Sequence, residues 1–254
     1  MLHHSNMLVS VIIPSYNSEN YIKRAVSSVL GQTYDNLEII VIRNGGRPLP
    51  YLGNSPKIRI IDLEENQGVS SARNIGIQEA RGEYIALLDA DDYWDKEKLE
   101  LQMQVIRKYT RADMAPGICF TGRRLYYETD GHIKKGKYVK CEKTVTYYDL
   151  LKTNQINCSS VVIRKDLALK HPFPDGEKMH EDYAVWLEIL REGEYALGIN
   201  RPLLLYRVSP GSKSGNKFRS AVMTYNVYRY VGLSVIESLI HMMTYTFYGV
   251  KKYI

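Results

Sequence analysis

Three aspartates lie within four residues, at Asp89, Asp91 and Asp92, immediately after the apolar run of residues 84–88. Carboxylates this close repel one another, and a cation among them relieves the repulsion. Their hard oxygen atoms suit Mg²⁺ or Mn²⁺, which also bind diphosphate oxygens. The alternative interpretation is an acidic helix N-terminus. The apolar run that leads directly into the cluster favours a ligand site.

A second pair of carboxylates, Glu181 and Asp182, follows a glycine-bearing loop. The pair precedes a helical pattern that carries Val185, Trp186 and Ile189 on one face. A carboxylate here could take a proton from a reacting hydroxyl as a general base. Capping of the helix by acidic residues is the alternative, and it is the simpler interpretation of these residues alone.

Two further segments carry groups suited to a nucleotide. Residues 14–17 read Pro-Ser-Tyr-Asn, and here Tyr16 could stack on a base while Asn17 hydrogen-bonds to it. Arg73 lies early in a predicted helix, shortly after Gly68, where it could contact a phosphate or steady the acidic cluster. The plain alternatives are an ordinary strand-to-helix loop and a solvated arginine.

The pattern of the first half predicts a mostly parallel α/β sheet as the scaffold for these residues. Short apolar runs alternate with amphipathic segments, which is typical of strands joined by crossover helices. Ligands bind at the carboxyl ends of such strands, where residues 14–17 and Asp89 fall. Strands are expected at 8–13, 37–42, 58–63 and 84–88, and helices from a cap at Ser18 to Gly31, at 70–80 and at 95–109.

The second half is less regular. A hairpin is expected from 117–127 and 137–140 around Asp130 and Gly131. A strand is expected at 159–163, helices at 147–153 and 181–191, and a small-residue loop at 209–217. The loop suggests a boundary, with residues 1–217 as the main domain and 218–254 as a C-terminal helical extension.

The C-terminal segment is apolar at helical spacing from Leu233 to Val250 and nearly long enough to span a bilayer. Glu237 and His241 would be costly inside hydrocarbon, so an amphipathic helix at a membrane interface fits better than a span. Packing of this helix on the protein's own core is an equally open alternative.

Charge is unevenly distributed along the chain. The formal net charge is +6, yet the segment from residue 201 onward contains eight basic residues and one acid, Glu237. Such a basic end suggests an anionic partner, namely a phosphate group, a membrane or a nucleic acid. A solvated surface with surplus lysine is the alternative. The apolar stripe favours lipid over nucleic acid.

The three cysteines, Cys119, Cys141 and Cys158, are widely separated and show no metal-binding spacing. Buried free thiols in a reducing compartment are expected. The first residues lack the basic start and long apolar stretch of a secretory signal.

Together these features resemble the inverting glycosyltransferases of family 2, which have the GT-A fold. The order and spacing of the motifs, from about Leu8 to about Ser214, carry the resemblance more than any single motif does. The matching segments are 9–17, 66–68 with 72–76, 88–92, Glu181-Asp182, and Tyr206-Arg207 ahead of Ser212 and Ser214.

The resemblance implies a role for each matching residue. The residues expected to bind the base, the ribose or sugar, and the diphosphate are Pro14, Tyr16, Asn17, Asn44, Arg73, Asp89, Ala90, Glu181, Arg207 and Ser212. Asp91 would ligate Mg²⁺ or Mn²⁺ in a D-x-D arrangement. Asp182 would be the catalytic base, and the 209–217 loop would close over the diphosphate.

The same resemblance implies substrates and a location. The donor would be a nucleoside-diphosphate sugar, with a UDP-sugar expected, and the acceptor a glycan or a polyprenyl-diphosphate-linked saccharide of surface polysaccharide synthesis. The protein would act in the cytoplasm, peripherally on the inner face of the cell membrane. An acceptor hydroxyl would attack the far face of the anomeric carbon, and one displacement would invert that centre.

Two positions depart from the family pattern. Arg43 stands where an aspartate that reads uracil is usual, and arginine cannot accept a hydrogen bond from the uracil N–H. Ser209 stands where a histidine near the metal is common. These departures leave the base and the third metal ligand open.

The alternatives in other classes are less well supported. A nucleotidyltransferase of the same fold would show a glycine-rich basic run after the first strand, and none is present. A noncatalytic sugar-nucleotide-binding subunit is disfavoured by the intact Asp89, Asp91 and Asp182. A dinucleotide-binding dehydrogenase is disfavoured because the first strand is not followed by G-x-G-x-x-G.

Overall fold

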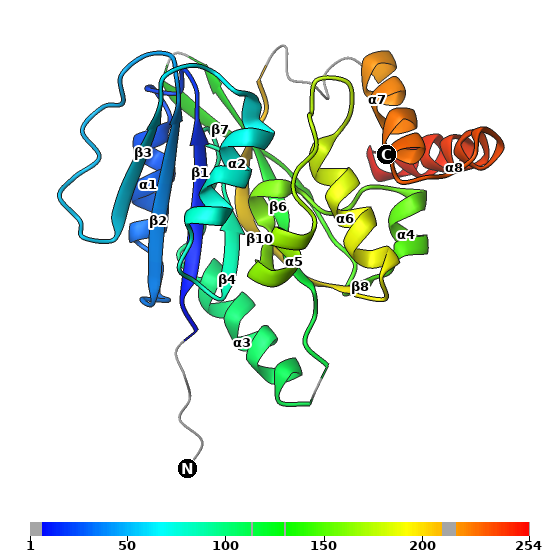
Figure 1. The fold of residues 1–254 in the computed structure, drawn as a ribbon, viewed down its shortest axis with the longest axis horizontal. Coiled ribbons are helices and arrows are strands. Elements are labelled where there is room, and N and C mark those ends of the chain that lie inside the picture. The colour runs from blue at the N-terminus through cyan, green and yellow to red at the C-terminus, as the bar shows by residue number, and fades with distance from the viewer. Residues whose placement is uncertain (1–6, 113, 130, 210–216, 254) are drawn as a thin grey trace.

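A mixed sheet forms the centre of the molecule in the computed structural model, which describes residues 7–112, 114–129, 131–209 and 217–253 (Figure 1). Its strand order is β3-β2-β1-β4-β9-β6-β10-β5, with β7 paired to β6 and β8 paired to β10. The strands are β1 (Val9–Ser15), β2 (Leu37–Asn44), β3 (Ile58–Leu63), β4 (Tyr84–Leu87), β5 (Tyr93–Trp94), β6 (Ile118–Thr129), β7 (His132–Val139), β8 (Thr144–Val145), β9 (Val162–Arg164) and β10 (Ala196–Arg207).

Helices cover both faces of this sheet. They are α1 (Ile22–Leu30), α2 (Gly68–Glu79), α3 (Lys98–Thr110), α4 (Tyr147–Lys152), α5 (Lys165–Lys170), α6 (Glu181–Arg191), α7 (Lys217–Tyr230) and α8 (Val235–Tyr253), with the short 3₁₀ helix η1 at Cys158–Ser160. The apolar residues of α1 and α3 share one buried cluster, and those of α2, α4, α5, α6 and α7 share another. Strand β1 contributes to both, because successive side chains of a strand point to opposite faces.

The parallel part of the sheet places the predicted site residues. Strand β1 pairs in parallel with β2 on one side and with β4 on the other, so the strand order reverses between β1 and β4. Ligands bind at such a switch point, outside the carboxyl ends of the strands. Residues 14–17 end β1 and Asp89 follows β4, so the two expected ligand loops lie at the same edge of the sheet.

The elements expected in the first half differ only at their ends, and the two-residue strand β5 was not expected. Helix α1 begins at Ile22, because Ser18 forms a turn: its hydroxyl lies 2.5 Å from that of Ser15 and its carbonyl accepts the N–H groups of Tyr21 and Ile22. The helix expected from residue 95 begins at Lys98, because the Asp95 carboxylate accepts the N–H of Glu97 in a turn.

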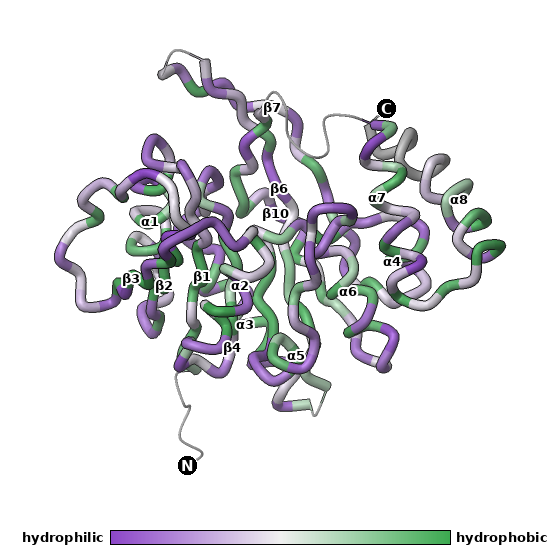
Figure 2. Tube along the Cα trace, turned by 45° about the horizontal axis from the view of Figure 1, so that its top comes forward, coloured by the Kyte–Doolittle hydropathy of each residue, from purple (hydrophilic) through white to green (hydrophobic). Residues whose placement is uncertain are grey.

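The second half differs more. The hairpin is longer than expected. Its strands β6 and β7 pair as far as Thr129 and His132, directly beside the turn. Strand β10 was not predicted, because Pro202 interrupts the sequence pattern and a register shift accommodates it. Figure 2 shows the mostly hydrophilic β6–β7 hairpin projecting from the molecule.

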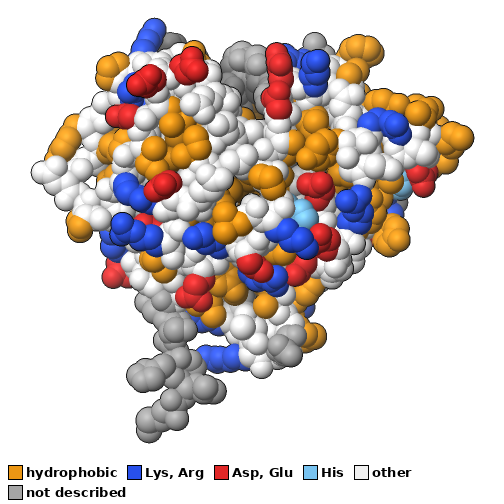
Figure 3. All heavy atoms as spheres, viewed as in Figure 1, with side chains coloured by type: hydrophobic (Ala, Val, Ile, Leu, Met, Phe, Trp, Pro, Cys, Tyr) orange, Lys and Arg blue, Asp and Glu red, His pale blue; other side chains and the backbone are white. Residues whose placement is uncertain are grey.

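The C-terminal helices pack on the rest of the protein, which was one of the two alternatives for this segment. Helix α8 packs on α7 and α4, where Met242 and Tyr245 contact the core and Ser238 is fully buried. Its other face is exposed and apolar, and we call this face, formed by Val235, Ile236, Leu239, Ile240 and Met243, the α8 apolar face. Figure 3 shows hydrophobic side chains gathered over this helix. Among the described residues, no helix is both long and apolar enough to cross a membrane.

Candidate active site

The acidic loop after β4 is held in place by three other elements. The Asp89 N–H donates to the Ser159 hydroxyl at 3.1 Å. The Tyr126 hydroxyl donates to the Asp91 carbonyl at 2.6 Å. The Asp92 carboxylate accepts the backbone N–H of Arg207 at 2.8 Å. The loop therefore has a fixed shape set by η1, β6 and β10.

Electrostatic repulsion is concentrated in this loop. Burial, and then repulsion from Asp89, raises the pKa of Asp91, although Arg207 opposes the shift. Burial, and then repulsion from Asp91 and Asp89, raises the pKa of Asp92 well above its usual value. The cluster thus favours the binding of a positive group.

Arg73 joins the acidic loop to the second carboxylate pair. This arginine is only 3% exposed, and its Nη2 donates to Asp89 Oδ1 at 2.7 Å while its Nη1 donates to Glu181 Oε1 at 2.9 Å. Its guanidinium also lies over the Phe173 ring, 5.3 Å from the centroid. The sequence interpretation in which Arg73 steadies the acidic cluster therefore agrees with this geometry.

Asp182 lies at the start of α6, beside Glu181. One carboxylate oxygen accepts the N–H of Tyr183 at 2.8 Å. Burial, and then the neighbouring charge of Glu181, raises the pKa of Asp182 to about 7, against the opposing effect of Arg73. A carboxyl group with this pKa can take a proton efficiently near neutral pH.

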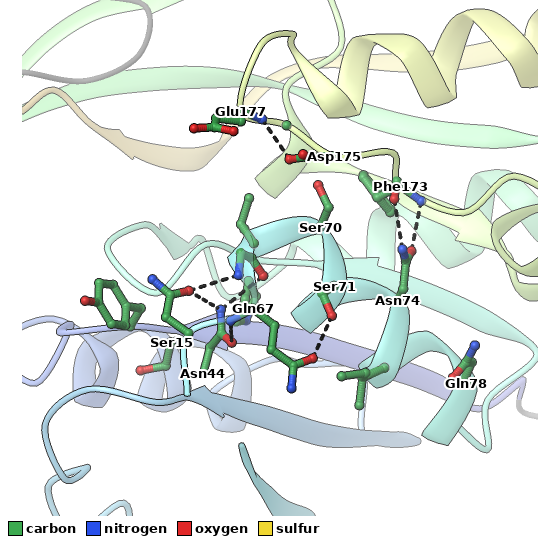
Figure 4. A pocket seen from close by; sticks show the side chains of 17 residues that line it. Ser15, Asn44, Gln67, Ser70, Ser71, Asn74, Gln78, Phe173, Asp175 and Glu177 are labelled. Atoms are coloured by element: carbon green, nitrogen blue, oxygen red, sulfur yellow. Dashed lines mark hydrogen bonds between the residues drawn. The ribbon is translucent and has the colours of Figure 1, made fainter. Parts of the chain in front are cut away.

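A cleft of about 950 Å³ (Figure 4) adjoins Arg73 through Phe173 and Glu181 through Gly176, and neither the acidic loop nor Asp182 lines it. Its walls come from the ends of β1 and β2, from the start of α2 and from residues 173–177. Pro14, Tyr16 and Asn44 line it, and Asn17 does not. Amide and hydroxyl groups between Asn66 and Gln78 line much of the rest, together with the carboxylates of Asp175 and Glu177. The cleft therefore suits an uncharged polyhydroxyl group or a base better than a phosphate.

Asn17 and Gly46 shape the loop that carries Tyr16, which lines this cleft. Asn17 has a φ of 47° and accepts the Arg47 N–H at 3.1 Å, which ties the loop after β1 to the loop after β2. Gly46 has a φ of +76°, and a Cβ there would lie 2.6 Å from the Asn17 Oδ1 and 3.1 Å from the Tyr16 ring. Only glycine fits beside the half-exposed Tyr16.

Asn44 and Arg43 both bond to other residues of this chain. The Asn44 side chain is buried, accepts the Gln67 N–H and donates to the Gly68 carbonyl, so it holds the turn that starts α2. Arg43 pairs with Asp62 on β3. Neither side chain provides the carboxylate of the aspartate that is usual at position 43 in the family that the sequence resembles.

Arg207 lies next to the acidic loop. Its guanidinium stacks on Tyr21 at 3.9 Å, donates to the Tyr21 hydroxyl at 2.6 Å and approaches the Asp91 carboxylate at 3.6 Å. Ser212 lies outside the described residues. Ala90 is 7% exposed and packs in the apolar cluster, so only its backbone could reach a ligand.

Sequence reasoning missed the residues that position the site, namely Tyr21, Tyr126 and Ser159. Tyr21 and Arg207 are 186 positions apart in the sequence, and Tyr126 is 35 positions from Asp91. No local pattern marks such partners, because the contacts form only when distant strands pair.

A divalent cation fits this site in part. Among the described residues, no three or more His, Cys, Asp or Glu side chains form a metal-binding group. Asp91 offers a carboxylate that is 38% exposed and faces Arg207. A metal here would therefore need oxygen atoms from a bound diphosphate to complete its ligands, as suits Mg²⁺ or Mn²⁺.

The fold and the site define a class of protein. The site has an acidic loop at a switch point of the sheet, a polar cleft, and a carboxyl group of raised pKa that comes from a part of the chain distant in sequence. These are the features of a nucleotide-sugar transferase of the GT-A fold. The family model described as glycosyl transferase family 2 matches residues 10–168, more than half of the chain. The chain belongs to glycosyltransferase family 2.

Two named relatives resemble the chain over most of its length. Bacillus subtilis TuaG, a glycosyltransferase named for teichuronic acid biosynthesis, is 36% identical over 228 residues and matches 87% of each chain. Escherichia coli WfaP, named UDP-Glc:alpha-D-GlcNAc-diphosphoundecaprenol beta-1,3-glucosyltransferase, is 32% identical over 250 residues, which is 97% of this chain and 95% of WfaP.

Solved structures share the fold. Staphylococcus aureus TarS in complex with UDP-GlcNAc superposes with a TM-score of 0.68 at 19% identity, covering 94% of this chain and 72% of TarS. The Pyrobaculum calidifontis mannosyltransferase PcManGT, in complex with GDP-Man and Mn²⁺, gives a TM-score of 0.66 at 17% identity, covering 93% and 68%. These likenesses confirm the predicted GT-A fold.

Proposed function

We propose that this glycosyltransferase is metal-dependent and inverting, and that it moves a sugar from a UDP-sugar to a saccharide linked through diphosphate to a polyprenol. The observation that carries the proposal is the buried Arg73 bridge, which joins Asp89 to Glu181 beside Asp182. The names of WfaP and of its E. coli relative WfgD, 32% identical to this chain, support the donor and the acceptor class.

The residues divide the work of transfer. Asp182 takes the proton of the attacking acceptor hydroxyl, and its raised pKa matches that task. Asp89 contacts the ribose or donor sugar, and Arg73 fixes the orientation of its carboxylate. Arg207 places positive charge beside Asp91, where the departing diphosphate gains charge. A bound Mg²⁺ or Mn²⁺, held by Asp91, would supply further positive charge there.

The nucleoside occupies the cleft in this proposal. Tyr16 stacks on the base, while Pro14 and Asn17 shape the loop that holds it. Asn44 acts as a positioning residue, because its side chain is hydrogen-bonded to the turn before α2. Arg43 pairs with Asp62, so in this proposal another group reads uracil, and the candidates are the amides of Asn66 and Gln67, which line the cleft.

Replacement of Asp91 tests the metal site. We expect Asp91→Asn to raise the Mn²⁺ concentration for half-maximal activity by at least about tenfold, because the carboxylate charge is lost. The measurement is release of nucleoside diphosphate from a panel of nucleotide sugars, after EDTA treatment and at increasing Mn²⁺. Asp35→Asn, at an exposed position next to Lys57, is the matched control. Equal metal response in the Asp91 variant and the control would overturn this assignment.

We also propose that the protein touches the membrane surface through residues 218–254. The α8 apolar face offers five exposed apolar side chains on one helix, and its opposite face is committed to the core. Such a helix binds at the boundary between headgroups and acyl chains. Deletion of the helix would uncover the core residues that Met242 and Tyr245 cover, so point substitutions are the better test.

Serine substitutions on the α8 apolar face test membrane contact. We expect the triple variant Ile236→Ser, Leu239→Ser and Met243→Ser to bind phosphatidylglycerol vesicles at least about tenfold more weakly, because the buried apolar area falls. Vesicle co-sedimentation gives the measurement.

The control for this experiment uses exposed apolar residues elsewhere. Ile60, Leu169 and Met114 are comparably exposed and match the triple variant in residue types. Their replacement by serine should leave vesicle binding unchanged. Equal loss in both triple variants, or loss in neither, would contradict membrane contact through α8.

A further inference from the structure

Helix α7 is fixed beside the carboxyl group that we assign as the base. The His180 ring nitrogen lies 3.1 Å from the Ser220 hydroxyl, and His180 directly precedes Glu181 at the start of α6. The Asn226 side chain donates to the Lys178 carbonyl at 2.8 Å. The first turns of α7 therefore face the loop that leads into Asp182.

The buried side of α7 makes this placement rigid. Tyr228 donates to the Leu151 carbonyl at 2.7 Å and lies 3.3 Å from the Tyr183 hydroxyl, while Met223 and Val227 are buried. These contacts join α7 to α4 and α6. The helix cannot rotate without breaking them, so its exposed face has a defined direction.

The exposed side of α7 is cationic near the base. Lys217 and Arg219 are exposed in the first turn, and Lys178 is exposed on the facing loop. Helix α7 contains no acidic residue. A phosphate group would meet only positive charge from this helix, which favours anion binding.

Apolar side chains adjoin these cations. Phe218 is 81% exposed, and Val222, one helical turn further on, is 45% exposed. The α8 apolar face lies on the helix that packs directly against α7. Figure 1 shows α7 at the same edge as the start of α6, with α8 beside it.

We infer that α7 binds the lipid end of the acceptor: Lys217 and Arg219 bind the diphosphate, and Phe218 with Val222 contacts the polyprenyl chain. The inference rests on the proposed function, because it takes the acceptor to be a polyprenyl-diphosphate-linked saccharide. The first turns of α7 bring cations and apolar side chains together next to the loop that leads into Asp182, and such an acceptor carries its diphosphate and its lipid next to its saccharide.

The experiment measures binding independently of transfer. Wild-type protein is titrated with undecaprenyl diphosphate, and separately with undecaprenol, in neutral detergent micelles that contain no anionic lipid. We expect tighter binding of the diphosphate. The double variant Lys217→Gln and Arg219→Gln should weaken that binding by about tenfold to thirtyfold, since each cation near a surface contributes about 1 kcal/mol, and should leave undecaprenol binding unchanged.

A matched variant separates specific recognition from general charge. Lys108→Gln with Arg111→Gln removes the same two residue types from exposed positions at the end of α3, on the opposite edge of the molecule. This variant should bind undecaprenyl diphosphate like the wild type. Equal weakening in both double variants, or none in the α7 variant, would overturn the inference.

Two further outcomes separate binding of lipid headgroups from binding of the acceptor, and failure of the inference from failure of the proposed function. If phosphatidylglycerol micelles bind as tightly as undecaprenyl diphosphate and respond equally to the α7 variant, α7 recognises headgroups and the inference is wrong. If the α7 variant loses binding but no nucleotide sugar supports transfer by the wild type, the inferred site stands and the proposed function fails.

Discussion

Asp182→Asn should lower the rate of glycosyl transfer by about 10²–10⁴-fold, because a general base contributes that much. Affinity for the donor should be unchanged, since the asparagine oxygen can still accept the Tyr183 N–H and the Arg73 bridge stays intact. Single-turnover transfer and donor binding by calorimetry measure the two effects separately.

Asp166→Asn is the matched control for this variant. Asp166 is exposed, pairs with Arg164 and lies on α5, so its replacement should leave transfer unchanged. Full activity in Asp182→Asn would place the base elsewhere. Parallel loss of donor affinity and rate would show that Asp182 supports the structure of the site and not the proton transfer.

The pKa of Asp182 also predicts how activity and stability depend on pH. Glu181, Asp89 and Cys158 face this carboxyl group together with Arg73, and the pKa is raised to about 7. The unprotonated form is the base, so the rate with wild-type protein should fall tenfold per pH unit below about pH 7. A flat profile between pH 5 and pH 7 would contradict the assignment.

The stability of the fold depends on pH in the direction opposite to that of the activity. The folded state binds this proton up to about pH 7, whereas the unfolded chain releases it near its usual pKa of 3.8. Stability therefore falls as pH rises through that window, and the cost persists above it. Asp182→Asn removes the cost, so its Tm at pH 8 should exceed that of the wild type by about 2–6 °C.

Arg73→Met should have the largest effect on stability. The substitution removes the buried guanidinium that forms an ion pair with each of Asp89 and Glu181, and breaking a buried pair costs about 3–5 kcal/mol. Transfer should fall as well, because Asp89 loses its fixed orientation. Thermal unfolding and steady-state transfer give the two measurements.

Arg164→Met provides a control of the same shape. Arg164 also bridges two carboxylates, Asp166 and Glu194, but at the solvated surface, so its loss should cost less than about 1 kcal/mol. Adding Glu181→Gln to Arg73→Met should restore part of the stability and none of the activity. A destabilisation of Arg73→Met no larger than that of the control would contradict the buried bridge.

Much of the fold follows from local sequence pattern. Apolar runs set β1, β2 and β4, because a strand buried on both faces needs continuous apolar residues, and a shorter apolar pattern sets the edge strand β3. The ends of β1 and β4 then place Tyr16 and Asp89 at one edge of the sheet. The motif order predicted the family, and both the family and the fold are confirmed.

The rest depends on contacts between distant residues. Strand β10 contains Arg201 and Pro202 in its middle, and its pairing with β6, β5 and β8 makes it a strand. Tyr126 and Ser159 hold the acidic loop from other strands and turns, without a sequence signal of their own. The two faces of α8 could not be assigned from periodicity, since both carry apolar residues.

The anomeric configuration of the product tests the proposed chemistry most directly. Wild-type protein is incubated with Mn²⁺, a panel of α-linked nucleotide sugars and GlcNAc-diphosphate-undecaprenol, and the new linkage is assigned by NMR. We predict a β-linked product that forms with the wild type and is absent with Asp182→Asn. An α-linked product, or a β-linked product formed equally by both proteins, would contradict inversion with Asp182 as the base.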